Sequence, residues 1–218
     1  MDSKRFPGKP LADIVGKPMI QRVYESAAAC PEFEKVLIAT NSPEITKMKF
    51  PGVYTDGIYK NGSERVAHAA RILRLSEDEI IFNIQGDQVI FPQYIIADML
   101  SCFDDQDINI ATAGHKLFVR DMNNSGMVFV TVDENGNSKS FSRNHPGTQV
   151  FGHVGIYAYR NRYLQKYAQL SQTQNEKEYS LEQLRILENG GKIKVVLTEE
   201  PCNSVNTIDD VKIIERMI

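Results

Sequence analysis

The sequence predicts an α/β protein with a mostly parallel sheet and an inserted antiparallel subregion. Two observations support this prediction. Short runs that are apolar on both faces alternate with amphipathic helical patterns through the first half of the chain, as buried parallel strands and their covering helices do. The pattern changes near residue 124, where two short strands flank a tight turn at Asn135-Gly136. We therefore expect a single domain over residues 1–218, in which residues 124–160 form the antiparallel subregion.

The first half of the chain alternates between the two kinds of pattern. Helices are expected where apolar residues recur at helical spacing, over residues 17–30, 42–49, 62–75 and 92–103. Strands are expected at the short runs rich in Val, Ile and Phe, over residues 35–40, 79–87 and 108–114. Ser42 is the expected N-cap of the second helix, and Gly62 or Ser63 stands at the start of the third.

The second half begins with the expected hairpin over residues 126–143, followed by a strand with alternating aromatic residues over 152–160. A helix is expected in SLEQLRILENGG, with Ser180 as its N-cap and Gly190-Gly191 at its end. A strand over residues 192–200 and a closing helix from residue 207 complete the chain. Thr207 and Asp210 resemble a capping box at the start of that helix.

Composition excludes several classes of protein. The net charge of −3 gives no general attraction to nucleic acid or to an anionic membrane, so neither is expected as a partner. The apolar runs are too short to cross a bilayer, and the polar start has no apolar segment of a signal peptide, so a cytoplasmic location is expected. Cys30, Cys102 and Cys202 are scattered, which argues against a zinc site or a disulfide framework.

Two features predict where ligands bind. Arg5 and Lys9 flank a Pro-Gly turn in SKRFPGK, which is typical of a loop that holds an anion, and Asp87 ends the apolar run EIIFNIQGD. Because ligands of open α/β sheets bind beyond the carboxyl ends of the strands, we expect these features to meet there. Cations beside a carboxylate suit a metal–nucleotide complex. The loop matches neither G-x-x-x-x-G-K-[ST] nor G-x-G-x-x-G.

The order of several motifs along the whole chain resembles that of the CMP-Kdo synthetases, the 3-deoxy-manno-octulosonate cytidylyltransferases. These motifs are SKRFPGKPLADIVGKPMIQRVYE, NGSERV, NIQGDQ, SFSR, HVGIYAYR, LEQLRIL and VNTIDD. The opening motif is shared with other sugar cytidylyltransferases, including the CMP-sialate enzymes, whereas HVGIYAYR followed by LEQLR is more particular to the Kdo branch. The resemblance implies a Rossmann-like nucleotidyltransferase fold, usually a homodimer, that uses CTP and Mg²⁺.

The resemblance also implies a reaction and a set of site residues. The anomeric hydroxyl of Kdo, an acidic ulosonic sugar, would attack the α-phosphorus of CTP and release pyrophosphate. Arg5 and Lys9 would hold the triphosphate, and Asp87 would bind Mg²⁺ together with Asn206. The resemblance assigns nucleotide contacts to Asn61, Gly62, Ser63, Arg65 and Gln85, and sugar contacts to Arg143, His153, Tyr157 and Gln183. On a helix of this pattern, Gln183 and Arg185 are otherwise ordinary surface residues.

The start of the chain departs from the family pattern. In the family, the anion loop follows a strand and an Ala-Arg pair, and Met1 falls just after the position of that Arg. We therefore expect the natural protein to begin about ten residues upstream, which is about one strand and its turn. An intact-mass measurement on native material tests this expectation, and the alternative is a genuinely shortened homologue.

Other departures concern the metal and the sugar. Gln88 and Val89 replace a carboxylate and a proline, and Asn206 stands where a second metal-binding Asp is expected. Weaker Mg²⁺ binding is therefore predicted, with either Asp209 as a substitute ligand or Mg²⁺ arriving mainly as Mg-CTP. Gly126 and Phe129 fall where the family tends to have Asn and Lys. A nine-carbon or amino-substituted ulosonic acid is therefore an alternative substrate.

Two alternatives to a Kdo-activating enzyme stay open on the sequence. One is an acylneuraminate-type cytidylyltransferase with the same mechanism, against which HVGIYAYR and LEQLR argue. The other is a non-catalytic homologue that binds a nucleotide or a sugar, because the phosphate-contacting Arg is missing and Asn206 replaces a carboxylate.

Overall fold

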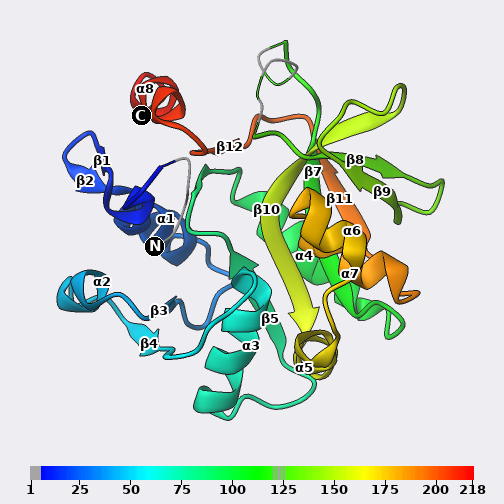
Figure 1. Cartoon of the computed structure of the whole chain (residues 1–218), viewed down its shortest axis with the longest axis horizontal. Coiled ribbons are helices and arrows are strands. Elements are labelled where there is room, and N and C mark those ends of the chain that lie inside the picture. Colours follow the sequence, from blue (N-terminus) through cyan, green and yellow to red (C-terminus); the bar gives the residue numbers. More distant parts are fainter. Residues whose placement is uncertain (1–5, 120, 122–123, 125) are drawn as a thin grey trace.

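The structure is a computed structural model that describes residues 6–119, 121, 124 and 126–218. Arg5 lies outside the described residues, so its predicted phosphate contact stays a prediction. Figure 1 shows a mixed sheet at the centre of the molecule, with the long strand β10 (Val150–Arg160) running through its middle.

The elements follow one another in an alternating order. The helices are α1 (Met19–Ala28), α2 (Pro43–Lys47), α3 (Gly62–Leu73), α4 (Tyr94–Ser101), α5 (Asn161–Gln169), α6 (Gln174–Tyr179), α7 (Glu182–Glu188) and α8 (Ile208–Glu215), with 3₁₀ turns η1 (Lys9–Leu11) and η2 (Cys102–Asp104). The other strands are β1 (Asp13–Ile14), β2 (Lys17–Pro18), β3 (Ile38–Thr40), β4 (Gly52–Tyr54), β5 (Ile80–Ile84), β6 (Gln88–Ile90), β7 (Ile110–His115), β8 (Phe129–Val132), β9 (Ser138–Ser142), β11 (Lys194–Thr198) and β12 (Asn203–Ser204).

The main sheet confirms the α/β class and is mixed in direction. Its order is β11-β7-β10-β8-β9, and β5 pairs with β10 beside β8. β7 and β11 are parallel, whereas β10 is antiparallel to β5, β7 and β8. The strand expected over 152–160 is part of β10. One end of β10 pairs with β8 and the other with β5, so it joins the antiparallel subregion to the strands of the first half.

Three small sheets lie beside the main one. β3 and β4 are parallel, while β1–β2 and β6–β12 are antiparallel pairs. Within the part of the chain that the structure describes, β5 pairs only with β10, and β3 pairs only with β4. The strand expected ahead of Met1 lies outside the sequence and stays a prediction.

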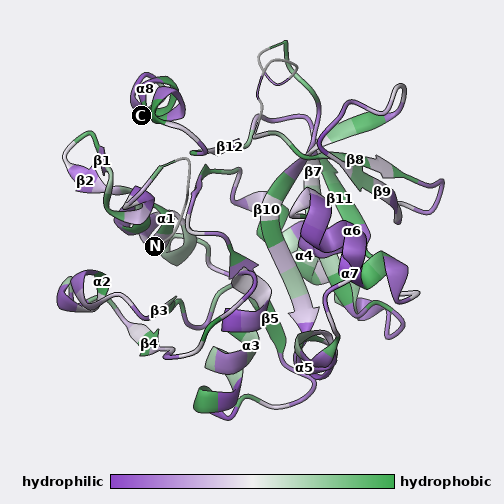
Figure 2. Ribbon diagram, in the orientation of Figure 1, coloured by the Kyte–Doolittle hydropathy of each residue, from purple (hydrophilic) through white to green (hydrophobic). Residues whose placement is uncertain are grey.

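The core is packed on both faces of β10. Val154, Ile156 and Ala158 face one side and pack with α4, whereas Tyr157 and Tyr159 face the other side and pack with α3, α5 and α7. This alternation follows from the period of two in a strand. Figure 2 shows hydrophobic residues gathered along β7, β10 and β11 at the centre of this sheet. A third cluster packs α1 and α8 near β6, which brings the two ends of the chain together.

Several predicted local signals are confirmed. The side chain of Ser42 accepts a hydrogen bond from the backbone of Ile45 at the start of α2. Thr207 and Asp210 form a capping box at the start of α8. The hairpin turns at Asn135-Gly136, where Gly136 has a φ of 73°, a conformation that glycine adopts without strain.

One predicted helix start is confirmed and another is wrong. Helix α3 begins at Gly62, as expected, and its N-cap is Asn61, whose side chain accepts a hydrogen bond from Glu64 N. Ser180, by contrast, does not cap α7. It ends α6 in a left-handed conformation with a φ of 53°, and Leu181 precedes α7. Helices α5 and α6 were not predicted. Tyr163, Leu164 and Tyr167 give α5 the apolar spacing of a helix, and this signal was missed, whereas α6 is a short and mainly polar segment.

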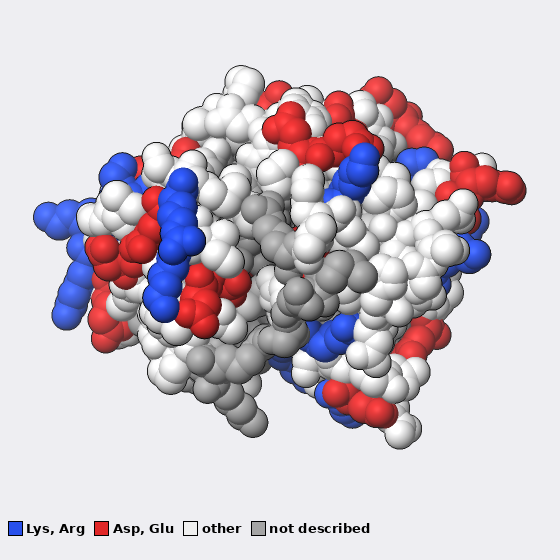
Figure 3. Space-filling model, turned by 90° about the horizontal axis from the view of Figure 1, so that it is seen from above, with Lys and Arg blue, Asp and Glu red and all other residues white. Residues whose placement is uncertain are grey.

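The surface agrees with the charge argument. On the face that Figure 3 shows, Lys and Arg side chains are interspersed with Asp and Glu rather than gathered in one basic area. Among the described residues, no helix is both long and apolar enough to cross a membrane.

Candidate active site

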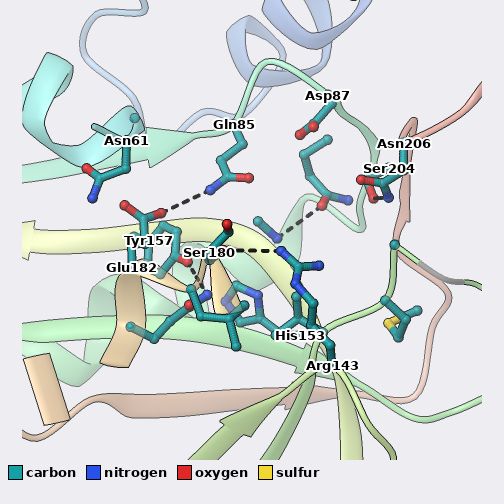
Figure 4. A pocket seen from close by; sticks show the side chains of 18 of the residues that line it. Asn61, Gln85, Asp87, Arg143, His153, Tyr157, Ser180, Glu182, Ser204 and Asn206 are labelled. Carbon is teal, nitrogen blue, oxygen red and sulfur yellow. Dashed lines mark hydrogen bonds between the residues drawn. The ribbon is translucent and has the colours of Figure 1, made fainter. Parts of the chain in front are cut away.

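A cavity of about 590 Å³ lies at the carboxyl ends of β5 and β7 and against the first half of β10. Ligands of α/β sheets bind at such an edge. The cavity brings together most of the residues that the sequence singled out: Lys9, Asn61, Gly62, Gln85, Asp87, Arg143, His153, Tyr157, Gln183 and Asn206. Figure 4 shows them entering from elements that are far apart in the sequence.

The anion loop and the strand-end carboxylate meet as expected. Lys9 Nζ lies 2.5 Å from Asp87 Oδ2 and donates a second hydrogen bond, 3.0 Å long, to the carbonyl of Val205. Val205 N in turn donates to the carbonyl of Asp87 at 2.9 Å. Gly8, with a φ of 71°, allows the tight turn that starts η1 and aims Lys9 at this point. The N-terminal loop, the loop after β5 and the segment after β12 therefore converge on one charged pair.

The donors beside this pair fit an Mg²⁺ ion that arrives with a nucleotide. Asp87 supplies a carboxylate, and the Asn206 amide nitrogen donates to Ser204 Oγ at 3.1 Å, which leaves the amide oxygen for a ligand. Asp209 does not line the cavity; its side chain is exposed and pairs with Lys212, so a role as substitute ligand stays a prediction that this geometry does not support. The described residues contain no cluster of three or more His, Cys, Asp or Glu suited to a metal. Mg²⁺ is commonly held by one or two carboxylates plus phosphate oxygens and water, which matches this sparse set.

The expected nucleotide residues separate into two groups. Asn61, Gly62 and Gln85 line the cavity, whereas the side chains of Ser63 and Arg65 point elsewhere. Ser63 is buried and its hydroxyl contacts the Tyr159 hydroxyl at 2.9 Å, within the core. Arg65 donates to Thr55 Oγ1 at 2.8 Å and lies over the ring of Tyr59. A nucleotide contact of these two side chains stays a prediction that this geometry does not support.

Arg143 holds the far wall of the cavity in place. Its Nε donates to the carbonyl of Tyr179 at 2.8 Å, and one Nη donates to that of Ser180 at 3.1 Å. These bonds attach the hairpin to the junction between α6 and α7, where Ser180 has its left-handed conformation. The guanidinium thereby brings a permanent positive charge to a cavity wall, as Figure 4 shows.

His153 contributes a neutral imidazole to the same wall. Burial, with a smaller effect of nearby His115, lowers the pKa of His153 to about 3. Its Nε2 lies 3.0 Å from Thr112 Oγ1, and its ring packs edge-on against Phe141. At neutral pH His153 is therefore an uncharged hydrogen-bonding group. Of the two residues expected to contact an acidic sugar here, only Arg143 carries a positive charge.

This depressed pKa predicts a pH dependence of stability. An unfolded chain takes up a proton at His153 below about pH 6.5, whereas the folded chain does so only near pH 3. The stability that the neutral His153 contributes to the free energy of unfolding is therefore complete above pH 6.5 and is lost progressively as the pH falls towards 3. Urea unfolding of the wild type and of H153Q between pH 4 and 7.5 measures this contribution. The control is H145Q, which replaces an exposed histidine. Equal pH slopes for wild type and H153Q would contradict the assignment.

Tyr157 and Gln183 lie in the same cavity wall as Arg143 and His153. Gln183 Nε2 donates to the Tyr157 hydroxyl at 2.6 Å, and both side chains are buried. Burial raises the pKa of Tyr157 well above its ordinary value, so the phenol stays neutral. The hydroxyl and amide are therefore fixed relative to each other before any ligand arrives.

Glu182 lines the cavity and was missed by sequence reasoning. It is buried, and its Oε1 accepts a hydrogen bond from Gln85 Nε2 at 3.0 Å. Burial raises the pKa of this carboxyl, although hydrogen bonds from Ser63, Tyr157 and Gln85 act in the opposite direction. Glu182 thus links Gln85, an expected nucleotide residue, to the helix that carries Gln183. The only signal in the sequence was its position next to Gln183 in LEQLR.

Arg185 organises the layer behind the cavity and is fully buried rather than on the surface. Its guanidinium donates to both carboxylate oxygens of Glu176, at 2.7 and 2.6 Å, and to Glu64 Oε1 at 2.8 Å. Asn61 joins the same group through Tyr167, whose hydroxyl accepts from Asn61 Nδ2 at 2.7 Å. This network ties α7 to α6 and to the start of α3, and so fixes the cavity wall.

Comparison with known proteins identifies the family to which the chain belongs. Residues 1–193 match the family model described as cytidylyltransferase. The chain belongs to the cytidylyltransferase family. The expectation drawn from the order of the sequence motifs is thereby confirmed.

The relatives of this cytidylyltransferase are similar over nearly their whole length. It is 34% identical to the 3-deoxy-manno-octulosonate cytidylyltransferase of Oleidesulfovibrio alaskensis, over 100% of this chain and 92% of that protein. It is 38% identical to 3-deoxy-manno-octulosonate cytidylyltransferase 2 of Actinobacillus pleuropneumoniae, over 96% of this chain and 92% of the relative. The 8-amino-3,8-dideoxy-manno-octulosonate cytidylyltransferase of Shewanella pealeana is 36% identical, over 98% of this chain and 93% of the relative.

A solved structure agrees with the sequence comparison. The CMP:2-keto-3-deoxy-manno-octonic acid synthetase complexed with CTP superimposes with a TM-score of 0.84 at 31% identity, over 99% of this chain and 93% of that one. A glucose-1-phosphate thymidylyltransferase from Bacillus anthracis superimposes with a TM-score of 0.69 at 11% identity, which shows a shared fold alone. The Rossmann-like nucleotidyltransferase fold of this cytidylyltransferase is therefore confirmed.

Proposed function

We propose that this cytidylyltransferase transfers CMP from CTP to the anomeric hydroxyl of 3-deoxy-D-manno-octulosonate (Kdo) and releases pyrophosphate. The observation that carries the proposal is the arrangement of one cavity. The Lys9–Asp87 pair lies on one side of it, and Arg143 with His153 lies on another. One side suits a metal–triphosphate, and the other suits a carboxylated sugar. Full-length similarity to relatives named for this reaction supports the assignment.

The residues on the phosphate side of the cavity form no covalent bond to the substrates in this reaction. The anomeric oxygen forms a bond to the α-phosphorus of CTP and its hydroxyl proton passes to water, while the bond from that phosphorus to the bridging oxygen breaks and pyrophosphate leaves with the electron pair. Positioning and charge neutralisation promote such a step. Lys9, now hydrogen-bonded to Asp87 and Val205, would turn its ammonium to the phosphate oxygens as the negative charge of the leaving group grows.

Asp87 is the residue proposed to hold the metal, with the amide oxygen of Asn206 as a neutral helper. A bound Mg²⁺ would supply a Lewis acid that neutralises charge on the triphosphate. Since Asn206 brings no charge, Asp87 is the single carboxylate proposed for this role. We therefore infer that Mg²⁺ enters mainly as Mg-CTP and binds this protein weakly without the nucleotide.

The sugar side would hold Kdo by complementary charge and by fixed hydrogen-bonding groups. Arg143 would attract the sugar carboxylate, because a guanidinium matches a carboxylate in shape and charge. The neutral ring of His153, the Tyr157 hydroxyl and the amide of Gln183 would contact sugar hydroxyls. The contact of His153 with Thr112 and the hydrogen bond between Gln183 and Tyr157 hold these groups in place before binding, which lowers the cost of ordering them.

The choice of sugar is tested by release of pyrophosphate from CTP and Mg²⁺. The assay compares Kdo, 8-amino-3,8-dideoxy-manno-octulosonate and N-acetylneuraminate, because one relative is named for the amino sugar. We expect the highest kcat/KM with Kdo and no release with N-acetylneuraminate. A preference for the amino sugar would change the proposed substrate from Kdo to its 8-amino relative. A preference for N-acetylneuraminate would favour the acylneuraminate-type alternative. No release with any sugar would favour a non-catalytic homologue. The expected homodimer and the cytoplasmic location stay predictions.

A further inference from the structure

Gly126 packs directly against the side chain of Asn206. A Cβ atom placed on Gly126 would lie 2.7 Å from Asn206 Cγ and 2.8 Å from both its Cβ and its Nδ2. A Cβ atom essentially never approaches other heavy atoms so closely in folded proteins, so a larger residue at position 126 forces one of the two to move. Both residues line the cavity, yet they are 80 positions apart in the sequence (206 − 126).

The backbone on the Asn206 side is fixed. Asn206 N donates to Asp210 Oδ2 at 2.8 Å, and the preceding residue, Val205, donates to the carbonyl of Asp87 at 2.9 Å. Strand β12, which ends at Ser204, pairs with β6. Ser204 Oγ also accepts the hydrogen bond from the Asn206 amide nitrogen. A clash at this position would therefore be relieved by rotation of the Asn206 side chain and loss of its bond to Ser204.

The backbone on the Gly126 side is also held. Gly126 N donates to Asn124 Oδ1 at 2.8 Å, and Met127 N donates to the carbonyl of Asn124 at 3.0 Å. Strand β8 follows three residues later and is paired on both edges. The turn at Gly126 thus has little freedom to retreat from Asn206.

We propose that Gly126 is a positioning residue for Asn206. Its missing side chain leaves the space in which the Asn206 amide bonds to Ser204 and presents its oxygen to the cavity beside Asp87, as Figure 4 shows for the three labelled residues. The two departures from the family pattern, Gly126 and Asn206, form one coupled pair. The proposal rests on the proposed function for the identity of the ligand, a divalent cation carried by CTP.

A double-mutant cycle tests the coupling. The variants are G126A, N206G and the double variant, because glycine at 206 removes all three atoms that a Cβ at 126 would meet. The probe is Mn²⁺ with CTP and no sugar, followed by electron paramagnetic resonance, so no turnover is needed. Loss of a group that orients a metal ligand commonly weakens metal binding about 10-fold to 100-fold. We expect G126A and N206G each to weaken Mn²⁺ binding at least about tenfold, and the double variant to be no weaker than N206G.

Two controls separate a positioning role from a loss of fold. G86A introduces the same methyl group at a glycine whose added Cβ would meet only the flexible end of Ile20, 3.3 Å away. It should bind Mn²⁺ within about twofold of wild type, and every variant should keep the wild-type melting temperature within a few degrees. S204A should weaken binding in the same direction as G126A, since it removes the bond that orients the amide.

The outcomes are distinguishable. Additive effects of G126A and N206G, or unchanged Mn²⁺ binding in G126A, would overturn the coupling while leaving the proposed function intact. Failure of the wild-type protein to bind Mn²⁺ with CTP would contradict both the proposal and the proposed function.

Discussion

Replacement of Asp87 by Asn is expected to lower kcat about 10³-fold with a small change in melting temperature. The substitution keeps the shape of the side chain and removes the single carboxylate beside Lys9. With Asn at both 87 and 206, neither of the two described residues proposed to hold the metal carries a negative charge. Loss of one group that stabilises transition-state charge commonly costs about 10²–10³ in kcat, and loss of metal binding adds to this cost.

The matched control for this prediction is D209N. Asp209 is also near Asn206 in the sequence, but its side chain is exposed and pairs with Lys212 on α8. We expect D209N to keep kcat within about twofold of wild type, since an exposed pair contributes little. Steady-state release of pyrophosphate at saturating CTP and Mg²⁺ measures both variants. If D87N retained wild-type kcat while D209N lost it, the metal assignment would belong to Asp209 instead.

Replacement of Arg185 by Met is expected to destabilise the protein by about 3–5 kcal/mol. The guanidinium is completely buried and bonds to Glu176 and Glu64, whose side chains are 3% and 12% exposed. Hydrogen bonds and charge from Arg185 lower the pKa of Glu176 despite the opposing effect of its burial. Removal of the cation leaves a buried carboxylate without its partner, which is the costly way to break an internal ion pair.

The control for Arg185 is R162M, which breaks the Arg162–Asp78 pair on the surface. Its two side chains are 44% and 78% exposed, so the loss should stay below about 1 kcal/mol. Equilibrium unfolding in urea compares the variants at pH 7. A loss of less than about 1 kcal/mol in R185M would show that the buried network is not a main support of the cavity wall.

The sequence was a good guide to the fold where the pattern is local. The apolar runs around Ile81 and Ile110 are strands because they are buried on both faces, and Ser42 caps its helix through its own neighbours. The place of β10 in the main sheet could not be read from local patterns. It depends on pairing with residues 37 to 80 positions away, from Gly152 with His115 to Arg160 with Ile80, and the pattern of a single strand does not specify its partners.

Most of the residues that the motifs singled out do line the cavity, because chemistry-bearing residues follow strand ends and loops in a recognisable order. Lys9 and Asp87 were predicted to meet, and they do so in a direct ion pair. Glu182 and Arg185 were missed because helical periodicity treats charged residues as surface, whereas here the charges are paired or hydrogen-bonded inside the protein. The contact of Gly126 with Asn206 is a long-range packing fact that no single motif contains.

The charged groups of the cavity lie on two separate sides before any substrate binds. Lys9 and Asp87 hold one side, and Arg143 is fixed on the other by two backbone carbonyls. Between them lie neutral groups whose pKa values are shifted by burial away from neutral pH, among them His153 and Tyr157. Such a cavity can neutralise a triphosphate and a carboxylate at the same time, and in the proposed reaction only the Lys9–Asp87 pair has to rearrange.

The most direct test of this account is ³¹P nuclear magnetic resonance of a reaction that contains the protein, CTP, Kdo and Mg²⁺. We predict that the three resonances of CTP are replaced by one phosphodiester resonance of CMP-Kdo and by pyrophosphate, in equal molar amounts, and that D87N leaves the CTP resonances unchanged. Persistence of CTP with the wild-type protein, or its conversion to CDP and inorganic phosphate, would contradict transfer of CMP to the sugar.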